Sequence, residues 1–157
     1  MAGDLTLRLA TPADAATIAR HRTRMFLEMR GWPDEAGADL LAALRDVLPP
    51  MLADGTYRGW FVVDGAGAIV AGAGVQVRPL LPRLETRRGL EALVVNVYVE
   101  PPYRRRGLAR RLMAAILDWC AGEGIERVAL HPSDAGKPLY ERLGFAPSGE
   151  LIRQLRV

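Results

Sequence analysis

The sequence holds one cysteine, one lysine and no long apolar run, and each scarcity excludes a class of protein. Cys120 has no partner, so an internal disulfide is excluded, and its apolar neighbours predict a buried core thiol. No apolar stretch approaches the roughly 20 residues that a membrane helix needs. Residues 1–4 lack the basic start and apolar core of a signal peptide. Together these absences predict a cytoplasmic protein that does not span a membrane.

Phosphate loops and metal sites of the common kinds are also missing. The lone Lys137 is far from any glycine pattern of the Walker type, in which Gly-Lys-Ser/Thr closes the loop. The glycines between Gly65 and Gly74 lie among alternating apolar residues and predict a hairpin rather than a dinucleotide fingerprint. His21 and His131 stand alone without metal-ligand spacing, so no metal is expected and a structural role is the default for both.

The pattern of apolar residues predicts one domain, spanning residues 1–157, with a mixed α/β fold. A crossover helix should follow the central strand. The expected order is a strand at residues 5–9, a helix from 11 to about 29, a helix ending before Pro49 and Pro50, strands at 60–63 and 69–77, a loop at 78–89, a strand at 92–99, a helix from 108 to 122, a strand at 127–130, a helix, and a C-terminal strand at 151–157.

The most informative segment is the one in which the strand ending at Val99 breaks at Pro101 and Pro102 and re-enters as an arginine-rich helix start. A helix N-terminus leaves its first backbone N–H groups unpaired and carries a partial positive charge, so it favours a bound phosphate. Gly107 permits close approach of the backbone to such a ligand. The segment therefore predicts an anion site.

Two motifs give the chain a family resemblance. Arg104-Arg105-Arg106-Gly107-Leu108-Ala109 resembles the Arg/Gln-x-x-Gly-x-Gly/Ala signature of the GNAT superfamily of N-acetyltransferases. Downstream, Leu139-Tyr140-Glu141-Arg142-Leu143-Gly144-Phe145 resembles the Leu-Tyr-Glu-(Lys/Arg)-Leu-Gly-Phe segment of the same family in order, spacing and distance. The resemblance is close from about residue 91 to residue 145.

The resemblance implies an acyl-coenzyme A N-acyltransferase fold, in which about four helices flank a mostly antiparallel sheet with a splayed central strand. It also implies transfer of an acetyl group from acetyl-coenzyme A to a primary amine by direct attack in a ternary complex. Tyr140 matches the position of the frequent general acid. The positions that match donor-binding residues are Val97, Tyr98 and Val99 on the strand, and Arg104, Arg105, Arg106, Gly107, Leu108, Ala109 and Arg110 at the turn.

The chain departs from the family pattern near the tyrosine. Where many members place an asparagine and an alanine, this sequence has Ser133 and Gly136. A serine hydroxyl still donates or accepts a hydrogen bond, so Ser133 is retained as a donor-binding residue. Lys137 is retained as a residue that reaches the 3'-phosphate of coenzyme A, with a solvated side chain as the alternative.

The general base is left open. The strand that ends at the anion site offers only Asn96 and Tyr98 as polar side chains, and neither is a good base at neutral pH. The carboxylates nearest in sequence are Glu28, Glu91 and Glu100, and a water chain to solvent is the other alternative.

The acceptor is also left open, with aminoglycosides, protein N-termini, amino acids and small polyamines as alternatives. The resemblance implies an acceptor pocket built from the first two helices and the 78–89 loop, including Arg22, Phe26, Glu28, Met29 and Trp32. A non-catalytic acyl-coenzyme A sensor and an acetyltransferase acting on aminoacyl-tRNA are the competing functions. The arginines lack interleaved aromatic residues, which disfavours nucleic acid as a partner. An apolar C-terminal strand at 151–157 would allow a homodimer.

Overall fold

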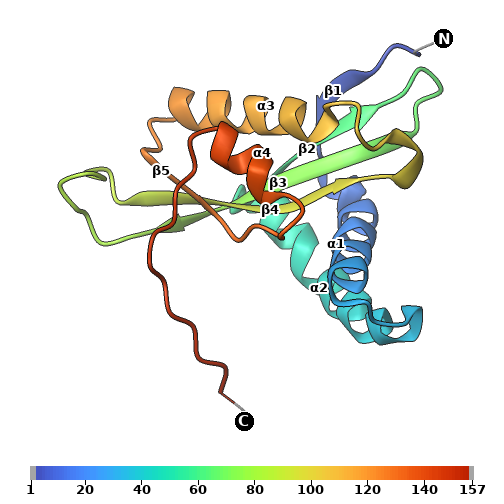
Figure 1. The fold of residues 1–157 in the computed structure, drawn as a ribbon, viewed down its shortest axis with the longest axis horizontal. Helices are drawn as coiled ribbons and strands as arrows, with labels where there is room; N and C mark the ends of the chain where they lie inside the picture. The colour runs from blue at the N-terminus through green and yellow to red at the C-terminus, as the bar shows by residue number, and fades with distance from the viewer. Residues whose placement is uncertain (1–2, 156–157) are drawn as a thin grey trace.

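The structure is a computed structural model that describes residues 3–155 and confirms the mixed α/β fold (Figure 1). One sheet has the strand order β1-β2-β3-β4-β5, with antiparallel pairing except for the parallel pair β4 and β5. The strands are β1 (Thr6–Leu9), β2 (Tyr57–Val63), β3 (Ile69–Pro79), β4 (Leu90–Val99) and β5 (Arg127–Leu130). The helices are α1 (Ala15–Arg30), α2 (Ala38–Asp54), α3 (Leu108–Gly122) and α4 (Lys137–Arg142).

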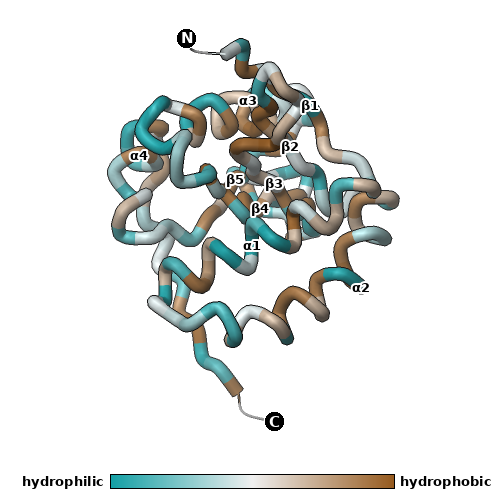
Figure 2. Tube along the Cα trace, turned by 90° about the vertical axis from the view of Figure 1, so that its right-hand side faces the viewer, coloured by the Kyte–Doolittle hydropathy of each residue, from teal (hydrophilic) through white to brown (hydrophobic). Residues whose placement is uncertain are grey.

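The helices cover both faces of the sheet, with α3 and α4 on one side and α1 and α2 on the other (Figure 1). Because successive strand residues point to opposite faces, β2 contributes Trp60 and Val62 to the core under α3 and Phe61 to the core under α1. Brown, apolar segments lie in the strands and along parts of α2, whereas α4 is mostly hydrophilic (Figure 2). No helix among residues 3–155 is long and apolar enough to cross a bilayer.

The central strand β4 changes its pairing halfway along. Its register with β3 slips where Gly72 faces Tyr98 but Gly74 faces Val95, which leaves one extra residue on β4. Asn96 takes up this bulge with a left-handed φ of 61°, a conformation that asparagine tolerates better than most residues. On its other edge β4 pairs with β5 only over residues 91–94. Beyond Val94 the two strands no longer pair, which confirms the splayed central strand.

Helix α2 runs further than the sequence predicts. The prediction that it ends before Pro49 is wrong, because the helix continues through both prolines to Asp54. A proline within a helix removes a backbone donor and costs about 3 kcal/mol. Here the turn that contains the prolines buries Leu48 and packs Met51 and Leu52 against the core under α1. Burial of these side chains offsets the missing hydrogen bonds.

The predicted C-terminal strand is also wrong for the residues that can be described. Residues 151–155 form no strand, and Leu151, Ile152 and Leu155 are 96%, 67% and 72% exposed. Residues 156–157 of the prediction lie outside the described residues. An apolar run becomes a strand only beside a strand that it can pair with, and none of the described strands pairs with this segment. The strand through which a homodimer was predicted is therefore absent over 151–155.

Glu91 of β4 links this strand to β3 and β5, at the end of the sheet opposite the anion site. Its carboxylate is almost fully buried and accepts hydrogen bonds from Arg78 Nε at 2.7 Å and Arg127 Nε at 2.5 Å. Burial alone would raise the pKa of Glu91, but the bonds from Arg127 and Arg78 outweigh burial and leave it lowered. Since this ion-paired carboxylate lies at the far end of β4, Glu91 is not placed to act as the general base.

We expect Glu91→Ala to lower the free energy of unfolding by about 2 kcal/mol. Breaking a buried ion pair leaves charges without partners, and partial exposure of Arg78 and Arg127 reduces that cost. Urea denaturation measures the loss. Glu85→Ala in the exposed loop is the control and should stay within about 0.5 kcal/mol of the wild type. Equal stability of the two variants would contradict a role for Glu91 in holding the strands.

Candidate active site

A tight turn connects β4 to α3 at the site where the sequence predicts anion binding. Pro101 and Pro102 end the strand and begin a single 3-10 turn. Arg105 and Gly107 then adopt left-handed conformations, with φ of 62° and 74°. Such conformations point successive backbone N–H groups into a common concavity, which is a recurring way to bind anions.

Six consecutive backbone N–H groups in this turn, from Arg105 to Arg110, find no acceptor among the described residues. The first helical bond of α3 is donated by Arg111 N to Gly107 O at 3.0 Å. Unpaired donors at a helix N-terminus add to the positive end of the helix dipole. The turn therefore offers a preformed site for a phosphate or diphosphate group.

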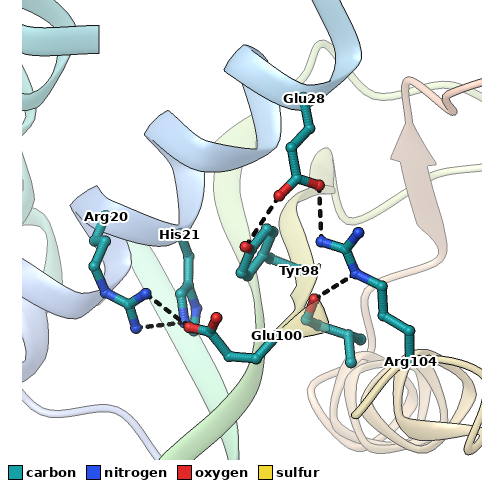
Figure 3. A network of polar contacts seen from close by, with 7 residues as sticks. Arg20, His21, Glu28, Tyr98, Glu100 and Arg104 are labelled. Atoms are coloured by element: carbon teal, nitrogen blue, oxygen red, sulfur yellow. Dashed lines mark hydrogen bonds and ion pairs between the residues drawn. The ribbon is translucent and has the colours of Figure 1, made fainter. Parts of the chain in front are cut away.

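The arginine side chains of the turn point in different directions. Arg104 turns towards α1 and pairs there with Glu28 at 2.7 Å (Figure 3). It also donates to Val99 O, at the end of β4, at 2.9 Å. Arg106 lies over the ring of Tyr103, with 5.3 Å between the guanidinium carbon and the ring centroid. Arg110 lines a groove of about 360 Å³ between α3 and α4, together with Leu139, Arg142 and Leu143. Arg110 and Arg142 thus add positive charge beside the unpaired amides.

The strand residues predicted to bind the donor lie next to the same turn. Val97 follows the bulge at Asn96, and β5 provides no pairing partner from Val95 to Val99. This edge of β4 is available for backbone hydrogen bonds to a ligand that enters where β4 and β5 separate. Tyr98 is different, since its side chain is buried and its hydroxyl donates to Glu28 at 3.2 Å.

Tyr140 lies on α4 with its ring packed edge-on against Phe145, at a centroid distance of 6.0 Å. Burial raises the pKa of its hydroxyl above the usual value, so the group keeps its proton at neutral pH. The hydroxyl makes no hydrogen bond among the described residues. It therefore retains both a proton and an unused donor position.

Ser133 and Gly136 fit each other at the start of α4. Ser133 Oγ accepts a hydrogen bond from Gly136 N at 3.1 Å, which holds the turn that precedes the helix. A Cβ atom at position 136 would lie 3.1 Å from the ring of Tyr140 and 3.2 Å from Ser133 Oγ. The glycine in place of alanine thus accommodates the tyrosine and the serine. Lys137 is exposed and lies 3.8 Å from Glu141.

A network of polar side chains links α1 to the end of β4 (Figure 3). Glu100 pairs with Arg20 at 2.7 Å and lies 3.5 Å from the Nε2 atom of His21. The ring of His21 is tilted against that of Tyr98 at a centroid distance of 4.9 Å. Of the three carboxylates considered as the general base, Glu28 and Glu100 lie in this network. Both are engaged with arginines.

His21 is buried, but the structural role predicted for it leaves one ring nitrogen unsatisfied. Its Nδ1 atom has no hydrogen-bond partner among the described residues. Burial, assisted by the charge of Arg20, lowers the pKa of His21 to about 4. Its unfolded value is near 6.5. The unfolded chain therefore takes up this proton first as the pH falls.

We expect acid to destabilise the protein through His21. The stability that neutral His21 provides is present above pH 6.5 and is lost as the pH falls towards 4. At pH 4.5 the loss relative to pH 7 should be about 2 kcal/mol. Urea denaturation across this range measures how the free energy of unfolding changes with pH. His131→Asn is the control and should show the same slope as the wild type. A slope equally steep in His21→Asn would assign the effect to other groups.

A second network was missed by sequence reasoning. Arg22 Nη1 donates to Asn96 Oδ1 at 2.7 Å, and Asn96 Nδ2 donates to the hydroxyl of Tyr57 at 3.0 Å. Burial raises the pKa of Tyr57 to about 12. The positions are 39 and 74 residues apart along the chain, so no local pattern indicates the contacts. The asparagine in the middle of a mostly apolar strand is the one signal that could have located the bulge.

The model of the acetyltransferase (GNAT) family matches residues 17–145. The chain belongs to this family. A solved GCN5-related N-acetyltransferase from Ralstonia eutropha JMP134 is 33% identical and has a TM-score of 0.89, with 97% of this chain and 99% of that chain covered.

Two curated relatives have different names. N-alpha-acetyltransferase RimI of Mycobacterium tuberculosis is 27% identical over 153 residues, covering 98% of this chain and 85% of that protein. Glucosamine 6-phosphate N-acetyltransferase of Trypanosoma brucei brucei is 27% identical over 144 residues, covering 90% and 89%. The GNAT protein described here is therefore an acetyltransferase, and relatives of equal similarity act on unlike acceptors.

Proposed function

We propose that this GNAT enzyme transfers an acetyl group from acetyl-coenzyme A to a primary amine, by direct attack within a ternary complex. The observation that carries the proposal is the run of six unpaired backbone N–H groups from Arg105 to Arg110. The diphosphate of coenzyme A has the charge and the acceptor oxygens that such a site requires. Arg110 and Arg142 line the adjacent groove, where they favour the 3'-phosphate.

The geometry of β4 supports the same assignment. The pantetheine arm of the donor has amide groups that can pair, much as another strand would, with the edge of β4 that β5 leaves unpaired. The positions for this pairing are Val97 and the N–H group of Val99, because the carbonyl oxygen of Val99 already accepts from Arg104. This pairing would place the thioester near the bulge at Asn96. A backbone N–H group beside the bulge would then stabilise the oxyanion of the tetrahedral intermediate.

The chemistry requires one new bond and one broken bond. The neutral amine nitrogen attacks the thioester carbon and forms the carbon–nitrogen bond. The tetrahedral intermediate then collapses, and the carbon–sulfur bond breaks. The amine loses a proton to solvent or to a carboxylate of the α1 network. Tyr140 gives its proton to the departing sulfur, so that coenzyme A leaves as a thiol. The raised pKa of Tyr140 keeps that proton available at neutral pH.

The test is a screen for thiol release from acetyl-coenzyme A with a panel of amines. The panel holds an aminoglycoside, glucosamine 6-phosphate, a peptide with a free N-terminus, amino acids and spermidine. Acetylated product, identified by mass, and thiol in equal amounts are the expected result. Binding of acetyl-coenzyme A without amine-dependent thiol release would support a sensor and would contradict the proposal.

A further inference from the structure

Arg22 occupies an unusual electrostatic position on α1. Its guanidinium group is partly buried, donates to the neutral side chain of Asn96 at 2.7 Å, and lies 4.8 Å from the centroid of the Phe26 ring. Its charge is incompletely solvated at this depth, and burial accordingly lowers the pKa of Arg22. A cation removed from water is stabilised by an anion that compensates for the lost hydration.

None of the carboxylates in the described residues provides that compensation. On the same helix, Arg20 pairs with Glu100 at 2.7 Å. Across from it, Arg104 pairs with Glu28 at 2.7 Å. The nearby carboxylates of the α1 network are therefore taken up by other arginines, and Arg22 forms no ion pair among residues 3–155. Its remaining donors are free for an anion from outside the chain.

The point at which Arg22 contacts β4 indicates whether that anion belongs to the donor or to the acceptor. Asn96 precedes the turn by four residues, and a strand rises by about 3.3 Å per residue, so Arg22 contacts the strand roughly 13 Å before the turn begins. At the turn, the six unpaired amides are proposed to take the phosphates of the donor. The pantetheine arm between these points is uncharged. An anion near Asn96 must therefore come from the acceptor.

We propose that Arg22 binds a carboxylate or phosphate group on the amine acceptor. The substrate class is thus an amine that carries an anion a few bonds from its nitrogen, and a polycationic acceptor is disfavoured. The inference rests on the proposed acetyltransferase function and adds a specificity-determining residue to it. A guanidinium group binds both anions through paired N–H donors, so both chemistries are included.

The test uses pairs of amines that differ only in the anion. The pairs are L-phenylalanine with L-phenylalanine amide, and O-phosphoethanolamine with ethanolamine. For each pair kcat/KM is measured with saturating acetyl-coenzyme A. The amino group of L-phenylalanine amide is less basic than that of L-phenylalanine. At neutral pH more of it is unprotonated, so the amide is the more reactive of the two without an enzyme. A preference for the acid therefore reflects binding of the carboxylate. The two pairs separate carboxylate from phosphate recognition.

We expect at least one pair to show a preference of about tenfold or more for the anionic member, because a charge-assisted hydrogen bond contributes that much. In Arg22→Gln the ratio should fall to about one, mainly through KM of the anionic amine. Arg22→Lys keeps the charge and should retain part of the preference. Arg45→Gln removes an exposed positive charge from α2 and is the matched control, which should keep the full ratio.

Three outcomes overturn the inference. They are a ratio near one in the wild type for both pairs, a preference for the uncharged members, and a preference for the anion that survives in Arg22→Gln. Absence of acetylation with every amine, although acetyl-coenzyme A binds, would instead overturn the proposed function on which the inference rests. Circular dichroism of each variant confirms that it is folded before the kinetics are compared.

Discussion

Gly107→Glu should weaken binding of acetyl-coenzyme A by at least about 100-fold. Gly107 has a φ of 74°, and a residue with a side chain adopts this conformation at a cost of roughly 1–2 kcal/mol. The glutamate also places a negative charge among the amides that are proposed to hold the diphosphate. Repulsion between this charge and the diphosphate adds to the loss of affinity, because it replaces the attraction of the positive N-terminus of α3. Isothermal titration calorimetry measures both proteins.

Two further variants separate charge from backbone strain. Apart from the two neighbours in the chain, no atom of the described residues lies within 4 Å of a Cβ built at Gly107, so substitutions there have room and the variants should fold. Gly107→Asn is neutral and tolerates the left-handed conformation, so we expect a loss of less than about tenfold. Gly107→Ala adds the conformational cost without the charge and should fall between the other two. Unchanged affinity in Gly107→Glu would contradict the anion site.

Tyr140→Phe should lower kcat by about 100-fold and leave KM for acetyl-coenzyme A within about threefold of the wild type. A positioned general acid contributes 100-fold or more, and phenylalanine removes the proton without changing the packing against Phe145. The raised pKa of the tyrosine predicts activity that persists into alkaline solution. Steady-state kinetics with an accepted amine measure the effect.

The control is Tyr103→Phe, which makes the same chemical change outside the proposed donor site. Its hydroxyl donates to Asp64 at 3.0 Å, on the hairpin turn, and kcat should stay within about twofold. A Tyr140→Phe enzyme with unchanged kcat would show that the sulfur leaves without help from this hydroxyl. A rise in KM with unchanged kcat would assign Tyr140 to donor binding instead.

Local constraints explain which parts of this fold could be predicted from the sequence. The turn at Gly107 depends on prolines, a glycine and a helix start within a few residues, so its conformation is encoded locally. The hairpin between β2 and β3 is similar, since Asp64 accepts bonds from Ala66 N and Ala68 N within the turn itself. Both features are confirmed by the structure.

The features that were missed depend on contacts between distant segments. Helix α2 passes Pro49 and Pro50 because Leu48 is buried in the core, which a local rule about proline does not include. The contact of Arg22 with Asn96 joins positions 74 residues apart. The acceptor side of the site is made of such contacts between α1 and β4, which is why the sequence indicated the donor more clearly than the acceptor.

The backbone amides of the turn are proposed to bind the donor. Two-dimensional ¹H–¹⁵N correlation spectra, recorded while acetyl-coenzyme A is added, test it at single residues. The largest shifts should fall on the six N–H groups from Arg105 to Arg110, since these have no acceptor among residues 3–155 and gain one from the diphosphate. Saturable binding that leaves these six signals unmoved and shifts others would contradict the account.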